Sequence, residues 1–424
     1  MKDKRTIVCF GPGPVFKGGI ANYNTSLAKA MDKIQNTEVH IVSWTQQYPA
    51  IIPRDFIDRK SKVDQLEGTN IKVHYITNYN SPASWNSTVK LIKGLNPDKV
   101  IFQWAIAVQG IPLGYISKKL KKTKGIEVFF DLHFVIQKEG SALDNKLTKL
   151  GIKNADSYIV HAFKTADELK EIFPNKKFEV IERGNSISGN GIKVLKLYHP
   201  VYDMFSPDPD FDKIKVKKEM GLKENVFLYF GFIRKYKGLH NVLEAFANLA
   251  KQRDDVSLIV CGESFWNTLD NSKLSTKIKN ATFGVAKKLF LKNQDNEQHY
   301  NPLALIDELN ISHLVHLNNE FVPNEEVPMY FQVSDNIMLF YLTATPSGVE
   351  SIGYNFNMPM LSTNVGHFPE TVKDGFNGYM AKAGDIDSMT EAMNKSIENP
   401  IDRSNVAATS KDMSWTNYAN EILR

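Results

Sequence analysis

Three glycine-containing segments carry residues that could bind a phosphate or a sugar. In the first, Gly11-Pro12-Gly13-Pro14 is followed by Gly18-Gly19-Ile20-Ala21, between a strand-like and a helix-like run. Glycine lets a backbone approach a ligand closely, and the N–H groups that open a helix attract anions and sugar hydroxyls. The segment predicts a ligand loop at Gly18 and Gly19, although a plain strand-to-helix turn has the same pattern.

The second segment, residues 230–239 (FGFIRKYKGL), places three cations within four positions after a strand-like run. Positive charge at the carboxyl end of a strand suits a diphosphate, which needs charge neutralisation. Arg234, Lys237 and the backbone at Gly231 are the candidate contacts. Lys235 is equally typical of a solvated loop.

The third segment, residues 345–354 (TPSGVESIGY), is followed by residues 365–370 (VGHFPE). A Ser347-Gly348 turn that opens a helix can offer backbone amides and a hydroxyl group to phosphate oxygens. Glu370 follows a glycine turn at the end of the next predicted strand, where open α/β sheets bind their ligands. A carboxylate that merely stabilises a helix N-terminus is the other interpretation of Glu370.

Short apolar runs that alternate with helical patterns must position these segments. Strands are predicted at residues 6–10, 39–43, 71–76, 99–104, 126–131 and 157–161, and a second series at 226–231, 256–261, 313–317, 336–341 and 359–363. Continuous apolar strands between amphipathic helices are typical of parallel sheets covered on both faces. The pattern therefore predicts two successive α/β domains.

Prolines and acidic residues at 199–209 interrupt both periodicities and mark the domain boundary. The predicted N-terminal domain comprises residues 1–200 and the C-terminal domain residues 201–412. Residues 413–424 are expected to form a terminal helix anchored by Trp415, with packing back on the N-terminal domain as one option. An Asn- and Lys-rich stretch, 268–300, is expected to be a helical insertion.

The two predicted domains differ in charge, although the whole chain carries only +5 at pH 7. Residues 1–200 contain 30 basic and 18 acidic residues, whereas residues 201–424 contain 22 and 29. Such asymmetry suggests different partners for the two domains. Two cysteines are too few for a disulfide framework, and neither a membrane-spanning run nor a signal-peptide core is found. A cytoplasmic protein is expected.

The three segments, in this order, resemble those of glycosyltransferase family 4, a family of retaining enzymes with the GT-B fold. Four further segments match as well: 131–134 (DLHF), 155–161 (ADSYIVH), 199–202 (HPVY) and 324–327 (NEEV). The resemblance implies two Rossmann-like domains whose parallel sheets face each other across a cleft. The N-terminal domain would bind the acceptor, and the C-terminal domain would bind a nucleotide-sugar donor.

The chain departs from the family at two positions that often carry glutamates. Aligned on Pro359, these positions are Ala344 and Ile352, so both carboxylates are missing. The segment is similar to the subgroup that lacks this two-glutamate motif. The resemblance therefore assigns no ribose ligand, and Glu350 and Glu370 are the candidate replacements in donor binding.

The resemblance gives roles to the matching residues. Arg234 and Lys237 would stabilise the diphosphate as its bond to the sugar breaks. His133 matches a family position beside the transferred sugar, although a buried structural histidine is the ordinary interpretation of such a residue. Glu139 is a candidate on the acceptor side without a defined role. The other expected donor contacts are Gly18, Gly19, Gly231, Ser347 and Gly348.

No cofactor is expected, because the family uses the nucleotide-sugar as a substrate and does not require a metal. The sequence has no spaced cluster of His, Asp or Cys that would suggest a metal site. It also shows no carboxylate pair placed for a double displacement. Retention through a front-face path is therefore the working hypothesis.

A lysine-rich run follows the apolar stretch 111–116 and comprises Lys118, Lys119, Lys121, Lys122 and Lys124. Cations near a membrane surface gain about 1 kcal/mol each from anionic lipid headgroups. A solvated helix end explains the run equally well. Peripheral attachment to the inner face of the plasma membrane is the corresponding hypothesis, whereas no nucleic-acid-binding motif is found.

The sequence as a whole predicts a retaining glycosyltransferase of the hexosyltransferase class. It would move a sugar from a UDP- or GDP-sugar to a glycan or lipid-linked glycan in polysaccharide or glycoconjugate biosynthesis. One alternative is a nucleotide-sugar epimerase of the GT-B fold. The other is a non-catalytic partner subunit, against which the intact Arg234 and Lys237 argue.

Overall fold

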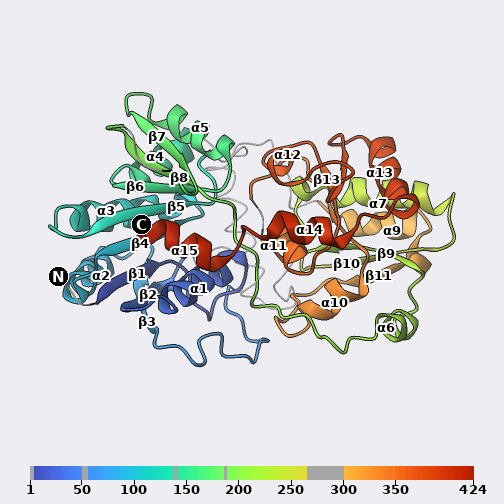
Figure 1. Cartoon of the computed structure of the whole chain (residues 1–424), viewed down its shortest axis with the longest axis horizontal. Coiled ribbons are helices and arrows are strands. Elements are labelled where there is room, and N and C mark those ends of the chain that lie inside the picture. Colours follow the sequence, from blue (N-terminus) through green and yellow to red (C-terminus); the bar gives the residue numbers. More distant parts are fainter. Residues whose placement is uncertain (1–3, 50–55, 137–141, 186–188, 265–299, 347) are drawn as a thin grey trace, which may run out of the picture.

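The chain folds into two α/β lobes, each built around a parallel sheet (Figure 1). The computed structural model describes residues 4–49, 56–136, 142–185, 189–264, 300–346 and 348–424. One sheet has the strand order β3-β2-β1-β4-β5-β6-β8-β7, and the other has the order β11-β10-β9-β12-β13-β14. The predicted architecture is confirmed. Most of the expected insertion at 268–300 lies outside the described residues.

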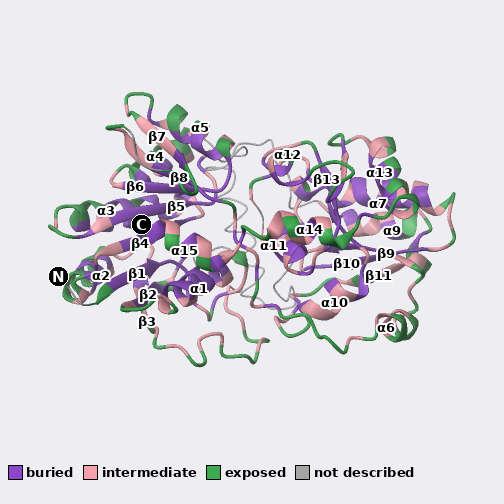
Figure 2. Cartoon of the chain, viewed as in Figure 1, coloured by how far each residue is buried: buried purple, intermediate pink, exposed green. Residues whose placement is uncertain are grey.

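Each apolar run predicted as a strand forms one, and the central strands are buried (Figure 2). The predicted strands are β1 (Arg5–Phe10), β2 (Thr37–Gln46), β3 (Lys72–Asn78), β4 (Lys99–Trp104), β5 (Glu127–Leu132), β6 (Ser157–Val160), β9 (Asn225–Phe230), β10 (Val256–Cys261), β11 (Val315–Asn318), β12 (Asn336–Leu339) and β13 (Met360–Thr363). The sequence analysis missed β7 (Phe178–Glu182), β8 (Ile192–Lys196) and β14 (Gly378–Ala381). These three lie at or next to a sheet edge. Charged residues interrupt the apolar runs of β7 and β8, and β14 is only four residues long.

Helices connect the strands and cover the sheets. They are α1 (Gly19–Asp32), α2 (Pro82–Leu95), α3 (Gly110–Lys121), α4 (Ala142–Ile152), α5 (Phe163–Ile172), α6 (Lys213–Glu219), α7 (Leu239–Ala250), α9 (Leu305–Glu308), α10 (Val327–Val333), α11 (Gly348–Asn355), α12 (Phe368–Thr371), α13 (Ile386–Glu398), α14 (Arg403–Ser410) and α15 (Trp415–Leu423). None of the helices in the described ranges is long and apolar enough to cross a membrane.

The C-terminal helix α15 packs against α1 of the N-terminal lobe (Figure 1). Its contact is centred on the fully buried carboxylate of Asp131 in β5. The hydroxyl groups of Tyr23 from α1 and Tyr418 from α15 both donate to Asp131 Oδ2, at 2.9 and 3.0 Å. His161 Nε2 lies 2.9 Å from the other oxygen. Burial disfavours the ionised carboxyl, but His161, His133 and Tyr23 outweigh it, and the pKa of Asp131 is lowered.

The chain crosses between the lobes twice, and the two crossings are hydrogen-bonded to each other. The Val201 N–H donates to Met413 O at 2.9 Å. Beside them, Ser351 Oγ of α11 lies 2.6 Å from His199 Nδ1. A single cluster of buried apolar residues extends from one lobe to the other at this point and includes Tyr202 and Trp415. The two lobes therefore share part of their core.

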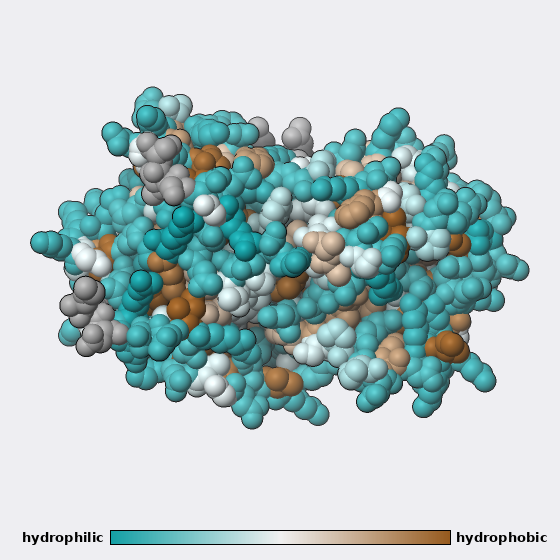
Figure 3. Space-filling view, viewed as in Figure 1, coloured by the Kyte–Doolittle hydropathy of each residue, from teal (hydrophilic) through white to brown (hydrophobic). Residues whose placement is uncertain are grey.

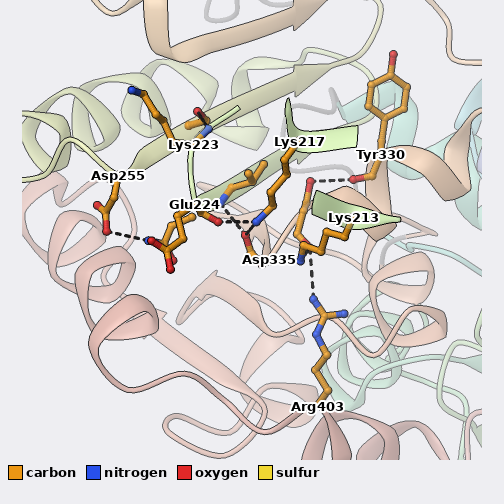
Figure 4. A network of polar contacts seen from close by, with 12 residues as sticks. Lys213, Lys217, Lys223, Glu224, Asp255, Tyr330, Asp335 and Arg403 are labelled. Atoms are coloured by element: carbon orange, nitrogen blue, oxygen red, sulfur yellow. Dashed lines mark hydrogen bonds and ion pairs between the residues drawn. The ribbon is translucent and has the colours of Figure 1, made fainter. Parts of the chain in front are cut away.

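A partly buried ion-pair network fixes the start of the C-terminal lobe (Figure 4). Asp335 accepts from Lys213 Nζ at 2.6 Å and from Lys217 Nζ at 2.8 Å, both on α6. It also accepts from the Val226 N–H at 2.8 Å. Val226 lies at the amino end of its strand. This network therefore anchors α6 at the amino ends of the strands, whereas parallel sheets bind ligands at the carboxyl ends.

We predict that Tyr418→Phe lowers the free energy of unfolding by about 1.5–3 kcal/mol, the usual contribution of a hydrogen bond to a charged group. The substitution leaves Asp131 with one donor fewer in a site that excludes water. Urea unfolding followed by fluorescence would measure the change. Tyr115→Phe is the matched control, because the Tyr115 hydroxyl bonds to Asn86 at the surface, and its loss should cost less than about 0.5 kcal/mol. Equal effects of the two substitutions would contradict the prediction.

Candidate active site

A cleft with a cavity volume of about 280 Å³ lies between the two lobes. Its walls come from the loop between β1 and α1 and from the carboxyl ends of β9, β10 and β12, the edge at which open α/β sheets bind ligands. In the view of Figure 3, residues of intermediate and high hydropathy (pale and brown) lie between the lobes, whereas hydrophilic residues (teal) cover most of the remaining face. Five predicted donor residues line the cleft together: Gly18, Gly19, Gly231, Lys237 and Gly348.

Gly18 and Gly19 bring the N-terminus of α1 to the cleft. Gly18 has φ +100°, which favours glycine, and a Cβ built there would lie 3.7 Å from the Phe232 ring of the other lobe. The Tyr202 hydroxyl donates to Gly19 O at 2.8 Å, which fixes the loop against the chain crossing. No side chain caps α1. Its N-terminus therefore has the character of an anion-binding site.

Lys237 provides the cation of the cleft. Its side chain is 7% exposed, and burial, followed by the nearby Arg234 charge, lowers its pKa to about 7. Gly231 has φ +90°, and a Cβ there would lie 2.9 Å from Lys237 Nζ. Glycine at this position thus leaves room for the ammonium group. Arg234 lies 5.7 Å from the Tyr236 ring and is not among the lining residues.

Gly348 begins α11 at the cleft, and Ser347 beside it lies outside the described residues. A Cβ on Gly348 would lie 2.8 Å from the Tyr202 ring. The same tyrosine therefore packs against Gly348 and bonds to Gly19. Glycine on both sides lets Tyr202 hold the two predicted ligand loops close together.

Glu350 and Glu370 are engaged outside the cleft. Glu350 is buried within the C-terminal lobe, where it contacts His367 and accepts from the Thr371 hydroxyl. Glu370 faces the N-terminal lobe, accepts from the Phe163 N–H at 3.1 Å and lies 3.3 Å from Lys196 Nζ. The structure thus places neither glutamate among the residues that line the cleft.

His133 follows β5 and is buried behind the cleft rather than lining it. Its Nε2 lies 2.8 Å from Gln103 Oε1, and its ring contacts Tyr23 edge-on with centroids 4.7 Å apart. Burial lowers the pKa of His133 to about 4, although Asp131 partly opposes the shift. The imidazole is therefore neutral near pH 7. Glu139 lies outside the described residues.

The lysine-rich run occupies the end of α3 and the turn after it, and all five lysines are exposed. Lys121 pairs with Asp156 at 3.0 Å. Burial, followed by the charges of Lys121, Lys149 and Lys153, lowers the pKa of Lys176. The run is thus part of a wider basic surface, which we call the basic patch, on the N-terminal lobe.

Sequence reasoning missed several lining residues, including Tyr202, Phe232, Tyr236 and Asp58. Tyr202 stands within the HPVY segment, which marked it as a landmark without giving it a role. Asp58 lies in a stretch with no strand or helix periodicity, so only the folded structure could place it. Within the described ranges, no three His, Cys, Asp or Glu side chains form a group that could hold a metal ion.

Comparison with known proteins identifies the C-terminal lobe. Residues 210–413 match the family model described as glycosyl transferases group 1. The matched residues make up most of the C-terminal lobe. The match confirms the predicted enzyme class, a glycosyltransferase. It includes Lys237 and Gly348 of the cleft.

Solved structures show that the whole chain has the GT-B fold of glycosyltransferases. Anabaena Alr3699/HepE in complex with UDP and glucose is similar with a TM-score of 0.67 and 14% identity, over 99% of this chain and 98% of that chain. Sucrose-phosphate synthase from Thermosynechococcus elongatus is similar with a TM-score of 0.64 and 13% identity, over 99% and 97%.

A curated protein matches part of the chain. Spore coat protein SA of Bacillus subtilis (strain 168) is 21% identical over 188 residues, which are 44% of this chain and 42% of the relative. The match thus spans about two fifths of the curated relative's length.

We predict that Lys237→Met stabilises the ligand-free protein at pH 6. The native pKa of Lys237, about 7, lies below the ordinary 10.5, so the native state binds fewer protons than the unfolded state between these values. Stability therefore rises with pH across this window, and the cost of the buried cation is fully present below pH 7. Relative to the parent protein, the free energy of unfolding of the variant should be higher by on the order of a few kcal/mol at pH 6 and by much less at pH 10.

Thermal unfolding of both proteins from pH 6 to pH 10 would measure the difference. Lys235→Met is the control, because Lys235 is exposed on the same loop and should show no such trend. A constant difference between Lys237→Met and the parent protein at all pH values would contradict the lowered pKa.

Proposed function

We propose that the protein is a retaining glycosyltransferase of family 4. It would move a hexosyl group from a UDP- or GDP-sugar to a glycan or lipid-linked glycan acceptor in polysaccharide or glycoconjugate biosynthesis. The observation that carries this proposal is the convergence of the buried Lys237, the N-terminus of α1 and the Gly348 turn on one interlobe cleft. A cation and open backbone amides suit a diphosphate. The UDP and glucose bound by Alr3699/HepE are consistent with such a donor.

In the proposed reaction, the bond between the anomeric carbon and the diphosphate oxygen breaks, and the acceptor oxygen forms the new bond on the same face. The acceptor proton passes to the departing diphosphate. Lys237, in its protonated form, and Arg234 stabilise the charge that develops on the leaving group, and a buried site strengthens this interaction. We propose that these cations act without a metal ion. The neutral imidazole of His133 would support the N-terminal wall of the cleft through Tyr23.

We predict that Arg234→Ala and Lys237→Ala each lower kcat/KM by roughly 10²- to 10³-fold, the usual effect of removing a group that stabilises transition-state charge. Donor turnover would be measured as UDP or GDP release from a panel of nucleotide-sugars. The panel is first narrowed by thermal shift, because a true donor stabilises the folded state. Lys235→Ala serves as the control on the same loop. Unchanged turnover in both variants would overturn the diphosphate assignment.

We further propose that the basic patch attaches the N-terminal lobe to an anionic membrane surface on the cytoplasmic side. All five lysines of the run are exposed, and the lobe carries an excess of basic residues. Lys149 of α4 and Lys153, which follows that helix, extend the positive surface. Such a position would bring the cleft close to a lipid-linked acceptor.

For this attachment, we predict that replacing the five lysines with Gln strongly reduces co-sedimentation with phosphatidylglycerol-containing vesicles, since each cation contributes about 1 kcal/mol. Binding to vesicles of phosphatidylcholine alone should be weak for all variants. A control replaces exposed lysines of the other lobe, Lys215, Lys218 and Lys251, and should bind like the parent protein. Equal binding by both sets of variants would contradict a role for the patch.

A further inference from the structure

The C-terminal wall of the cleft offers few carboxylates to a ligand. Ile352 lines the cleft with an apolar side chain, and Glu350 and Glu370 are engaged elsewhere. The lining residues include three acids: Asp58, Glu263 and Glu320. Adjacent hydroxyl groups on ribose or on a hexose are ordinarily held by a carboxylate, as in nucleotide sites where an acidic residue accepts from ribose. Asp58, Glu263 and Glu320 are therefore the candidates for binding such a pair of hydroxyl groups.

Asp58 belongs to residues 56–63, which we call the strap because they bridge the two lobes beside the cleft. The strap is held to the β1–α1 loop by two backbone bonds. The Lys17 N–H donates to Phe56 O at 2.8 Å, and the Asp58 N–H donates to Val15 O at 2.9 Å. The strap is therefore fixed to the loop that carries Gly18 and Gly19.

The other end of the strap docks on the C-terminal lobe. Glu325 Oε1 accepts from the N–H groups of Lys62 and Val63 at 2.6 and 2.9 Å. The Asn324 N–H donates to Ser61 Oγ at 3.2 Å. Burial disfavours the ionised form of Glu325, but the bonds from its own backbone and from Lys62 and Val63 outweigh it and lower its pKa. Residues 324–327 thus serve as the dock for an N-terminal segment.

The carboxylate of Asp58 is held in one orientation with capacity to accept further bonds. Its Oδ1 accepts from the N–H groups of Lys60 and Ser61, each at 3.0 Å. Among the contacts of the described residues, none involves Oδ2 of Asp58. An ionised carboxylate has about four lone-pair sites, so two neighbouring hydroxyl groups can still be bound.

The other two acids are less suitable. Glu320 is 72% exposed and pairs with Lys60 at 2.6 Å, so solvent and an opposite charge already satisfy it. Glu263 already has another interaction partner. Asp58 alone of the three comes from the N-terminal lobe, and it therefore reaches the ligand from the side opposite to Lys237.

We propose that Asp58 is the residue that binds a pair of adjacent hydroxyl groups of the donor, in place of a glutamate from the C-terminal lobe. The strap, docked on Glu325, positions this carboxylate. The inference rests on the proposed nucleotide-sugar donor. The hydroxyl pair belongs either to the ribose of the nucleotide or to the transferred sugar, and both present the same hydrogen-bonding chemistry.

The test measures the affinity of the full chain for UDP, 2′-deoxy-UDP and UDP-glucose by calorimetry, with GDP, 2′-deoxy-GDP and GDP-mannose as a second set. If Asp58 binds ribose, the parent protein should prefer UDP or GDP over the deoxy form by about 10-fold or more, the value of a hydrogen bond to a charged group. Asp58→Asn should bring this ratio close to one. If Asp58 binds the transferred sugar, the ratio stays and the extra affinity for the nucleotide-sugar over the diphosphate is lost.

Two variants separate binding from folding. Asp64→Asn makes the same change at an exposed position just beyond the strap and should leave all affinities unchanged. Glu325→Gln weakens the dock that positions Asp58, so, if Asp58 binds ribose, it should lower the affinity for UDP more than that for 2′-deoxy-UDP and move their ratio part of the way towards one. Parent-like affinities and ratios in Asp58→Asn would overturn the inference while leaving the proposed function intact. Failure of the parent protein to bind any of these nucleotides would overturn both.

Discussion

One buried carboxylate holds the N-terminal lobe in the arrangement that the cleft requires. Asp131 accepts hydrogen bonds from the hydroxyl groups of Tyr23 and Tyr418 and pairs with His161, so it joins α1, β5, the residue that follows β6, and α15 at a single point. A buried charge is stable only when such partners compensate its lost hydration. Tyr23 lies one turn into α1, and the first residue of that helix is Gly19. The position of the ligand loop therefore depends on a residue that no ligand is expected to touch.

Residues close to this carboxylate also connect the two lobes. Tyr202 bonds to Gly19 and packs against Gly348, while His199 and Ser351 join the chain crossing to α11. Around them the aromatic rings of Tyr23, His199 and Trp415 lie in contact. Interfaces inside a chain are often polar and mobile. This one has an apolar core shared by both lobes, and any relative motion must occur around it.

The sequence predicts the fold well, because fully buried parallel strands need continuous apolar residues. Runs such as TIVCF and VSLIVC carry that signal, whereas β7, β8 and β14 near the sheet edges do not. Glycine and lysine positions in the cleft were also predictable, because strand-to-helix turns fix where Gly18, Lys237 and Gly348 must lie. Side-chain direction was not predictable. Glu350 and Glu370 have suitable types and positions, yet His367 and Lys196 hold them outside the cleft.

The docking of α15 has a consequence for synthesis of the protein. The N-terminal lobe obtains Trp415 and Tyr418 of its core from residues made more than two hundred positions after its last strand, which ends at Lys196. Ribosomes add about 5–20 residues per second, and domains generally fold as they emerge. The first lobe therefore waits for roughly 10 to 40 seconds with Asp131 lacking one of its donors. During that interval the nascent lobe exposes the apolar surface of α1 that α15 later covers, and exposed apolar surface of this kind favours aggregation of partly folded chains.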